Sequence, residues 1–366
     1  MTAQSQEHAV SVLVADTAGV SFAEIRAGGL RRLGPVPGDT RGAIGTPRRA
    51  VRHERGLSVV ARVQESDVPL LTGRSADASD LRPVPVTPGG PAPALVSGVA
   101  ADGTALAVVG ERRYPERLDG DLYALPWGAD AWRPVPMPAD VSMMWVVGSQ
   151  GTTVHVVGAT GAPAAASVLE MRPALFAVDV AGGTVTELPL PAQGPARPLR
   201  DRLLPAGIDP SAGRLEQGAF HGDVLVANAS YGEAFEYEVL HAVDRRSGMW
   251  STVRLRRDDA VAEQYVDAAR TAYAVTYGAE LWTSRAGGPW RRTPLRARLA
   301  GLLGVPESRA RLNAAGFVGG RLLLAAAGGV VACALDGTAG RVLCRHGDDA
   351  RVRAFVQPPA GAVDGA

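Results

Sequence analysis

A pattern of short strands joined by tight turns recurs along the chain and constrains its fold more than any other feature. It is clearest in Ala174–Pro191, ALFAVDVAGGTVTELPLP, where two apolar runs flank Gly182 and Gly183. Two glycines between such runs accept positive φ angles and predict a β-hairpin with a two-residue turn. Related hairpins precede and follow this one. We therefore expect the chain to be built from repeats of one small β unit.

Seven units of four short strands account for most of the 366 residues. Their predicted bounds are about 9–37, 48–86, 94–138, 141–191, 215–256, 260–296 and 312–346. The first unit has only three strands, and one strand, 351–358, is left over at the end of the chain. A spacing of roughly 40–50 residues is typical of a β-propeller. We predict a single all-β domain over 1–366, a seven-bladed β-propeller of four-stranded antiparallel blades, closed when the C-terminal strand joins the N-terminal blade.

Proline positions agree with this arrangement. We count the C-terminal strand as the first strand of unit one. The predicted fourth strands then contain Pro35, Pro83, Pro85, Pro134, Pro136, Pro189 and Pro294, whereas within the seven unit bounds given above the predicted first and second strands contain no proline. Proline has no N–H to donate to a sheet and is therefore confined to sheet edges. The fourth strand is the outer edge of a propeller blade.

One hairpin supports a resemblance to known propellers. The segment ELWTSRAGGPWRRTPL (Glu280–Leu295) is similar to the hairpin of Asp-box and kelch-type propellers, in which a tryptophan after the turn packs between blades. Trp132, Trp250 and Trp290 occupy this position in units three, five and six. The Asp-box consensus, a Trp-Asp dipeptide and the kelch double glycine are absent. The chain thus resembles the β-propeller superfamily, with degenerate Asp-box-like and kelch-like blades. The resemblance does not identify a specific family within it.

Charge and composition exclude several classes of function. The formal net charge is +1, so neither nucleic acid nor an anionic membrane is expected as a partner. All 38 basic residues are arginine. Without lysine there is no P-loop and no Schiff-base chemistry. No apolar run reaches the length of a membrane span and the N-terminal segment lacks the pattern of a signal peptide, so we expect a cytoplasmic protein.

Cysteine and histidine give no metal motif. Cys333 and Cys344 lie on opposite strands of the last hairpin, either as a cross-strand pair or as two buried thiols, and a reducing cytosol favours the thiols. The six histidines are scattered, without His-x-His, His-Glu-x-x-His or Cys-x-x-Cys spacing. We expect no metal and no cofactor.

The lengths of the connections predict where a site would lie. In a propeller, the turns between first and second strands and between third and fourth strands share one face, and here they are short. The longer connections belong to the opposite face, which we call the long-loop face: Gly38–Pro47, Arg112–Gly120, Thr160–Pro173, Gln193–Arg214, Gly232–Glu236 and Ala297–Arg311. Functional residues concentrate on such loops. Leu299, Leu302 and Leu303 further predict a short helix in the last connection.

Polar residues near the starts of the inner strands are the candidates for a site on this face. Predicted ligand-binding residues are Arg49, Arg353, Asn313 and Gln264 on strands and Tyr114, Arg117 and Glu233 on loops. Predicted catalytic residues are Glu216 and Glu263, as proton donors or acceptors, and Tyr231, as a nucleophile activated by a neighbouring glutamate. The arginines suit an anionic ligand group. The competing interpretation is that these side chains are merely hydrated at the channel mouth.

Two functional hypotheses follow from this arrangement. The first is a cytoplasmic propeller that binds, and in one version transforms, a small anionic or polyhydroxylated molecule at the channel mouth, as a lyase, cyclase or hydrolase of a biosynthetic pathway. The second is a non-catalytic scaffold that binds a protein partner through the same face. No sequence motif decides whether the protein is an enzyme.

Overall fold

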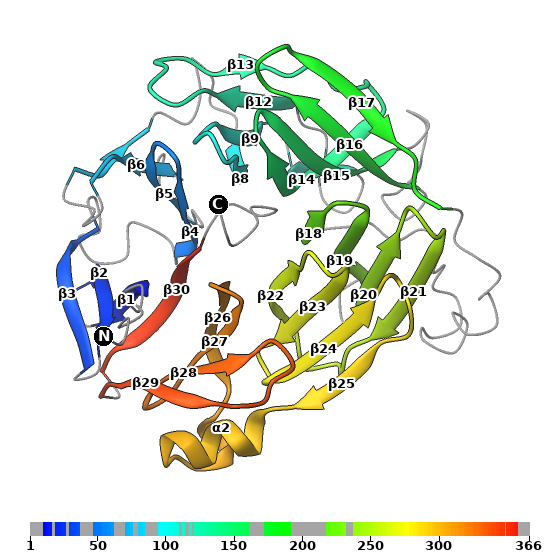
Figure 1. Cartoon of the computed structure of the whole chain (residues 1–366). Helices are drawn as coiled ribbons and strands as arrows, with labels where there is room; N and C mark the ends of the chain where they lie inside the picture. The colour runs from blue at the N-terminus through cyan, green and yellow to red at the C-terminus, as the bar shows by residue number, and fades with distance from the viewer. Residues whose placement is uncertain are drawn as a thin grey trace, which may run out of the picture.

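Small antiparallel sheets follow one another around a circle in the computed structural model (Figure 1). The structure describes residues 10–16, 19–26, 29–36, 47–61, 70–75, 80–84, 94–109, 112–113, 117–118, 121–160, 172–191, 217–231, 237–347 and 349–357. The strands nearest the centre of Figure 1, one from each predicted unit, are β30, β4, β8, β14, β18, β22 and β26. The short apolar runs and frequent turn residues of the sequence account for this all-β architecture.

Units three to seven each form a separate four-stranded antiparallel sheet. Unit three contains β8 (Ala94–Val99), β9 (Ala105–Val109), β12 (Asp121–Leu125) and β13 (Arg133–Pro134). Unit four contains β14 (Val141–Gln150), β15 (Thr153–Thr160), β16 (Arg172–Asp179) and β17 (Thr184–Leu188). Unit five contains β18 (Gly218–His221), β19 (Val224–Tyr231), β20 (Tyr237–Asp244) and β21 (Met249–Arg254). Unit six contains β22 (Val261–Val266), β23 (Thr271–Thr276), β24 (Glu280–Arg285) and β25 (Arg291–Pro294). Unit seven contains β26 (Leu312–Val318), β27 (Arg321–Ala326), β28 (Gly329–Ala334) and β29 (Arg341–Arg345).

Units one and two are joined in one eight-stranded sheet with the order β3-β2-β1-β30-β4-β5-β6-β7. Its strands are β1 (Ser11–Asp16), β2 (Gly19–Arg26), β3 (Gly29–Pro35), β4 (Pro47–His53), β5 (Gly56–Ala61), β6 (Leu70–Gly73), β7 (Arg82–Pro83) and β30 (Arg351–Gln357). The last strand of the chain, β30, pairs antiparallel with β1. It also pairs parallel with β4, through Val356 opposite Ala50 and Gln357 opposite Val51. This second pairing was not predicted.

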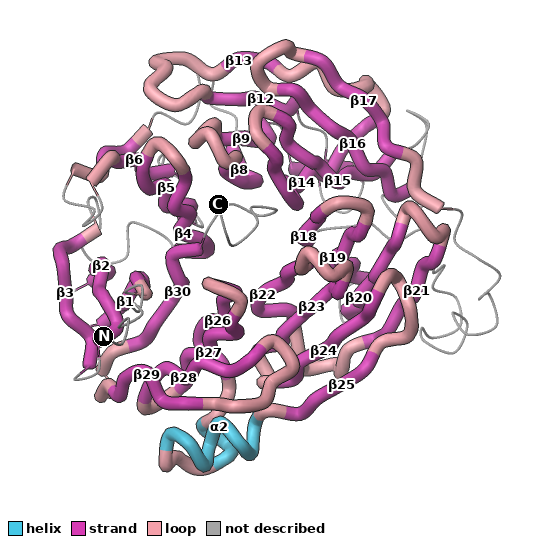
Figure 2. The backbone as a smooth tube through the Cα atoms, viewed as in Figure 1, coloured by secondary structure: helices cyan, strands magenta, loops and turns pink. Residues whose placement is uncertain are grey.

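The connections add little regular structure. Within the loop of unit three, β10 (Arg112–Arg113) and β11 (Arg117–Leu118) form a two-stranded ribbon. The predicted helix is present as α2 (Arg296–Leu303), followed by the 3₁₀ turn η2 (Glu307–Arg309). Figure 2 shows this helix at the outer rim, beyond the outer strands of units six and seven. Within the described residues, no helix has the length and apolar character needed to cross a bilayer.

The turn between β16 and β17 differs from the two-residue turn that Gly182 and Gly183 predict. Asp179 pairs with Thr184, so four residues form the turn. The Asp179 carboxylate accepts a hydrogen bond from the Ala181 N–H, and the Asp179 carbonyl accepts one from the Gly183 N–H. Of the two glycines only Gly183, at φ +68°, has positive φ. The side chain of Asp179 therefore sets a longer turn than the glycines alone suggest.

The hydrophobic core is divided into clusters that lie between successive units. Units six and seven share one cluster and units seven and one share another, in which Val12 and Phe355 meet Ala314 and Leu323. Further clusters join units one and two, two and three, three and four, four and five, and five and six. Trp132, Trp250 and Trp290, which were predicted to pack between blades, all contribute to these clusters. Cys333 and Cys344 are free thiols, buried on opposite faces of unit seven. Face-to-face packing of neighbouring sheets therefore holds the units together.

Proline placement agrees with the prediction only in part, because Pro136 and Pro189 lie just after the outer strands β13 and β17, and Pro85 lies outside the described residues. Pro83, Pro134 and Pro294 lie in outer strands, as expected. Pro47, however, is the first residue of the inner strand β4, which begins one residue before the predicted unit boundary. The first position of a strand tolerates proline because its N–H need not join the ladder.

A buried histidine beside the turn between β4 and β5 links units two and three. His53 accepts a hydrogen bond from the Arg55 N–H at Nδ1, and its Nε2 lies 3.0 Å from the Ser58 hydroxyl oxygen. The imidazole packs edge-on against Trp127 and fits against Gly103, where a Cβ would lie 2.7 Å from the ring. Burial lowers the pKa of His53 to about 4, an effect that Asp102 only partly offsets. The neutral ring is therefore part of this interface.

His53→Gln is expected to remove part of the acid sensitivity of the fold. The pKa in the unfolded chain is near 6.5, so the contribution of neutral His53 is complete above that pH and is lost as the pH falls toward 4. Between pH 8 and pH 5 the wild type should lose about 2 kcal/mol more free energy of unfolding than the variant. Urea titrations at both pH values measure this difference. Equal losses in the two proteins would show that His53 is protonated as easily in the fold as outside it.

Candidate functional site

Six of the seven inner strands are interrupted by bulges, whereas β18 pairs regularly. Where β4, β8, β22 and β26 pair with the second strands of their units, one extra residue on the inner strand shifts the register. The register of β14 with β15 shifts twice. The register of β30 with β1 shifts at Arg353. On β26 the extra residue is Asn313. Such bulges bend a strand and redirect its side chains, and they occur often beside functional sites. Two predicted ligand-binding residues, Arg353 and Asn313, are therefore bulge residues.

One side chain connects three inner strands. Gln357, on β30, donates a hydrogen bond from Nε2 to Glu263 Oε2 on β22, at 2.8 Å. Its carboxamide oxygen accepts a hydrogen bond from the Phe317 N–H on β26, at 3.1 Å. Unit seven lies between the units of β30 and β22, so the bond between Gln357 and Glu263 passes across the inner edge of that unit. Glu263 therefore faces the centre of the ring.

The second oxygen of Glu263 is also engaged. Glu263 Oε1 accepts a hydrogen bond from the Gln264 N–H at 3.0 Å. The two bonds together fix the plane of the carboxylate. The carboxylate of Glu263 is thus held in one orientation by its own strand and by β30.

A chain of amides continues from this point into unit five. Gln264, which is buried, lies with its Nε2 3.5 Å from Asn228 Oδ1 on β19. Asn228 in turn donates to Glu238 Oε1 on β20, and the same oxygen accepts the Val261 N–H, both at 3.1 Å. Hydrogen bonds between buried and half-buried polar groups thus connect unit six with unit five.

The described part of the site includes four of the predicted residues. Glu263 and Gln264 are adjacent on β22 and belong to the same network, but Asn313 and Arg353 make no hydrogen bond or ion pair with it among the described residues. Arg353 and Asn313 are each half-buried. The structure thus joins two of the four predicted residues directly and places the other two on β26 and β30, the next two inner strands.

The side chains of the other predicted site residues lie outside the described part of the structure. Glu216, Tyr114 and Glu233 lie outside the described residues. Arg49, Arg117 and Tyr231 belong to β4, β11 and β19, but only their backbone positions are described. Their roles stay predictions.

Gln357, Asn228 and Glu238 are members of the network that the sequence did not single out. Gln357 is the last residue of the strand Arg351–Gln357, where a polar residue is ordinary. Asn228 lies within an apolar strand, VLVANASY, and a buried amide there is the one signal that sequence reasoning could have used. Among the described residues, no group of three or more histidine, cysteine, aspartate or glutamate side chains is placed to hold a metal ion.

Solved structures with a similar fold exist at low sequence identity. A prolyl endopeptidase matches with a TM-score of 0.50 and 13% identity, over 82% of this chain and 43% of the endopeptidase chain, so this chain spans less than half of that protein. YCF48 from Cyanidioschyzon merolae matches with a TM-score of 0.42 and 12% identity, over 88% of this chain and 94% of its own. YCF48 bound to D1 peptide matches with a TM-score of 0.45 and 11% identity, over 83% and 86%.

The comparisons identify an architecture and no narrower group. No protein-family model matches the chain, and no curated protein is similar to it in sequence. At such low identity the likeness to the endopeptidase concerns the fold alone. The four-stranded antiparallel sheets and their face-to-face packing agree with that likeness. The chain therefore has the fold of β-propeller proteins, and its similarity to them does not define a specific family.

Proposed function

We propose that this chain is a seven-bladed propeller that binds a small anionic and polyhydroxylated molecule at its inner strands, without transforming it. The observation that carries the proposal is the hydrogen bond from Gln357 to Glu263, which holds a half-buried carboxylate at the centre of the ring. A ligand hydroxyl would donate to Glu263. Arg353, four residues before Gln357 on β30, would supply the positive charge for an anionic group.

The rigidity of Glu263 supports binding in preference to proton transfer. Its two oxygens accept hydrogen bonds from Gln357 and from the Gln264 N–H, so the carboxylate is held in one orientation before a ligand arrives. Binding groups that are already ordered cost less conformational entropy on association. A general acid or base, in contrast, must exchange a proton with the substrate. The proposal includes a cytoplasmic location. It also places six further side chains around the ligand: Arg49, Arg117, Tyr114, Tyr231, Glu216 and Glu233.

Closure of the ring by β30 is part of the same proposal. The pairing of β30 with β1 and the packing of Phe355 among residues of unit seven support a complete circle of seven blades over 1–366. In such a circle β30 is the inner strand of blade one, and Gln357 and Arg353 belong to the same wall of the channel as Glu263. The ligand would lie on the long-loop side of the Gln357–Glu263 bond.

Glu263→Gln is expected to weaken ligand binding about tenfold, the effect of losing one hydrogen bond to a charged acceptor. A panel of glucuronate, galacturonate, gluconate and myo-inositol would be screened by thermal shift, and the affinity of any binder measured by calorimetry. The control is Glu187→Gln, which removes the same charge from an exposed position on the outer strand β17. An equal loss of affinity in both variants, or binding of none of these compounds, would contradict the proposed site.

A further inference from the structure

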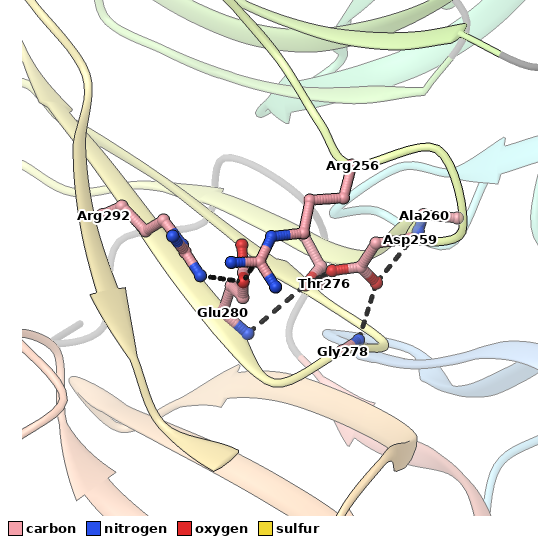
Figure 3. Close-up of polar contacts among 7 residues, drawn as sticks. All are labelled: Arg256, Asp259, Ala260, Thr276, Gly278, Glu280 and Arg292. Atoms are coloured by element: carbon pink, nitrogen blue, oxygen red, sulfur yellow. Dashed lines mark hydrogen bonds and ion pairs between the residues drawn. The ribbon is translucent and has the colours of Figure 1, made fainter.

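A second cluster of charges lies between units five and six, away from the inner strands. Glu280, at the start of β24, is buried, and its Oε1 atom is approached by two arginines. Arg256 comes from the connection between β21 and β22, with its Nε at 3.6 Å, and Arg292 comes from β25. Figure 3 shows the two guanidinium groups on opposite sides of the Glu280 carboxylate. The cluster thus links two neighbouring units.

The loop that carries Arg256 is held in place by a second carboxylate. Asp259 accepts hydrogen bonds from the Thr276 hydroxyl, from the Gly278 N–H at 2.7 Å and from the Ala260 N–H at 3.1 Å (Figure 3). These bonds tie the β21–β22 connection to the turn between β23 and β24. Asp259 is therefore used within the loop, and Arg256 is positioned over Glu280 by the backbone that Asp259 anchors.

Hydrogen-bond donors outnumber acceptors on this face. Each guanidinium has five N–H donors, and both arginines direct their contacts to the same oxygen of Glu280. The Arg256 side chain is 68% exposed and that of Arg292 is 37% exposed, so further donors of both reach solvent. Trp282, directly opposite Arg292 in the sheet and hence on the same face, has a buried indole N–H for which the described residues provide no acceptor. The group that would balance this face is an acceptor that carries no donors.

From this balance we infer that the surface between Arg256 and Arg292 binds a carboxylate group. The carboxylates of Glu280 and Asp259 already offset the two arginines in this cluster, so a ligand with a single negative charge disturbs the balance less than a phosphate dianion. Carboxylates also match the planar, bidentate geometry of guanidinium. Glu280 acts as a positioning residue, because its buried charge holds both guanidinium groups toward the same point. This site is separate from the inner strands and does not depend on the proposed ligand there.

The experiment titrates the full chain with acetate and with the blocked peptide acetyl-Gly-Glu-Gly-amide while following the arginine Nε–H resonances by NMR. The two probes distinguish a small free acid from an acidic side chain of a protein. Saturable shifts are expected for at least one of them, at a fixed ionic strength set with sodium chloride. Arg292→Gln and, separately, Arg256→Gln should each lower the affinity about tenfold.

The matched control is Arg291→Gln. Arg291 is adjacent to Arg292 on β25 but pairs with Thr283 and faces the other side of the sheet, and it is exposed. This variant has the same change in net charge and should bind within twofold of the wild type. Since Arg256 is largely exposed, its variant tests the site even if Arg292→Gln destabilises the fold. Shifts that do not saturate, stronger binding of inorganic phosphate than of acetate, or an equal loss in Arg291→Gln would overturn the inference.

Discussion

Phe355→Ala is expected to lower the free energy of unfolding by about 4 kcal/mol, the largest effect of any single substitution considered. The ring is 1% exposed and packs among residues of units one and seven. It also fills the space over Gly316, where a Cβ would lie 2.9 Å from the Cβ of Phe355. Truncation therefore removes buried apolar area and leaves a cavity between the first and the last unit. Equilibrium unfolding in urea measures the loss.

Arg351→Ala on the same strand is the control for this measurement. Arg351 is exposed, and its removal should change stability by less than about 0.5 kcal/mol. Phe355→Leu, which keeps most of the apolar volume, should fall between the two. If Phe355→Ala lost no more free energy of unfolding than Arg351→Ala, the packing of β30 against unit seven would not contribute to stability.

Asp244→Ala is expected to cost about 3 kcal/mol, at the lower end of the range for breaking a buried ion pair. Asp244 is fully buried at the end of β20 and accepts hydrogen bonds from the Arg246 N–H, from the Ser247 hydroxyl and from Arg270 of unit six. Alanine would leave these donors without their acceptor. The lower end applies because the Arg270 side chain is 35% exposed and regains some contact with water. Thermal and urea unfolding give the value.

The matched control is Asp223→Ala on the same unit. Asp223 lies 3.7 Å from Arg245 and its side chain is 47% exposed, so its loss should cost less than about 0.5 kcal/mol. Acid gives an independent check. Burial alone would raise the pKa of Asp244, yet the hydrogen bonds from Ser247 and Arg246 and the charge of Arg270 lower it below 3.8. Its contribution should therefore persist above that pH and disappear as the pH falls further. A similar cost for both aspartates would contradict the assignment.

The four-stranded units were predictable because they depend on local signals. Apolar runs, glycine turns and prolines at sheet edges each act over a few residues, and unit six follows its predicted strands closely. The helix Arg296–Leu303 was found from its leucine spacing in the same way. The length of the turn between Asp179 and Thr184 was not predictable from the glycine pattern, because the hydrogen bond from the Ala181 N–H to the Asp179 side chain sets a longer turn.

The candidate site was predictable only in outline. Glu263 and Gln264 were recognised as polar residues near the start of an inner strand, which is a local property. Their partners, Gln357 and Asn228, come from other units, and only the arrangement of the units brings them together. The bulge at Arg353 likewise depends on how β1 and β30 align, which residue spacing within either strand does not reveal.

The pairing of β30 with both β1 and β4 has a consequence for how the protein is made. Val14 pairs with Val352, which is far from it in the sequence, so units two to seven can form on the ribosome while β1 and β4 each keep an unpaired edge until residues 351–357 emerge. Unpaired edges invite association with other chains. Contacts between distant residues also form slowly, because a long loop must close first. Docking of β30 is thus expected to be the late step of synthesis-coupled folding, and a ribosome that stops before residue 351 would release an aggregation-prone chain.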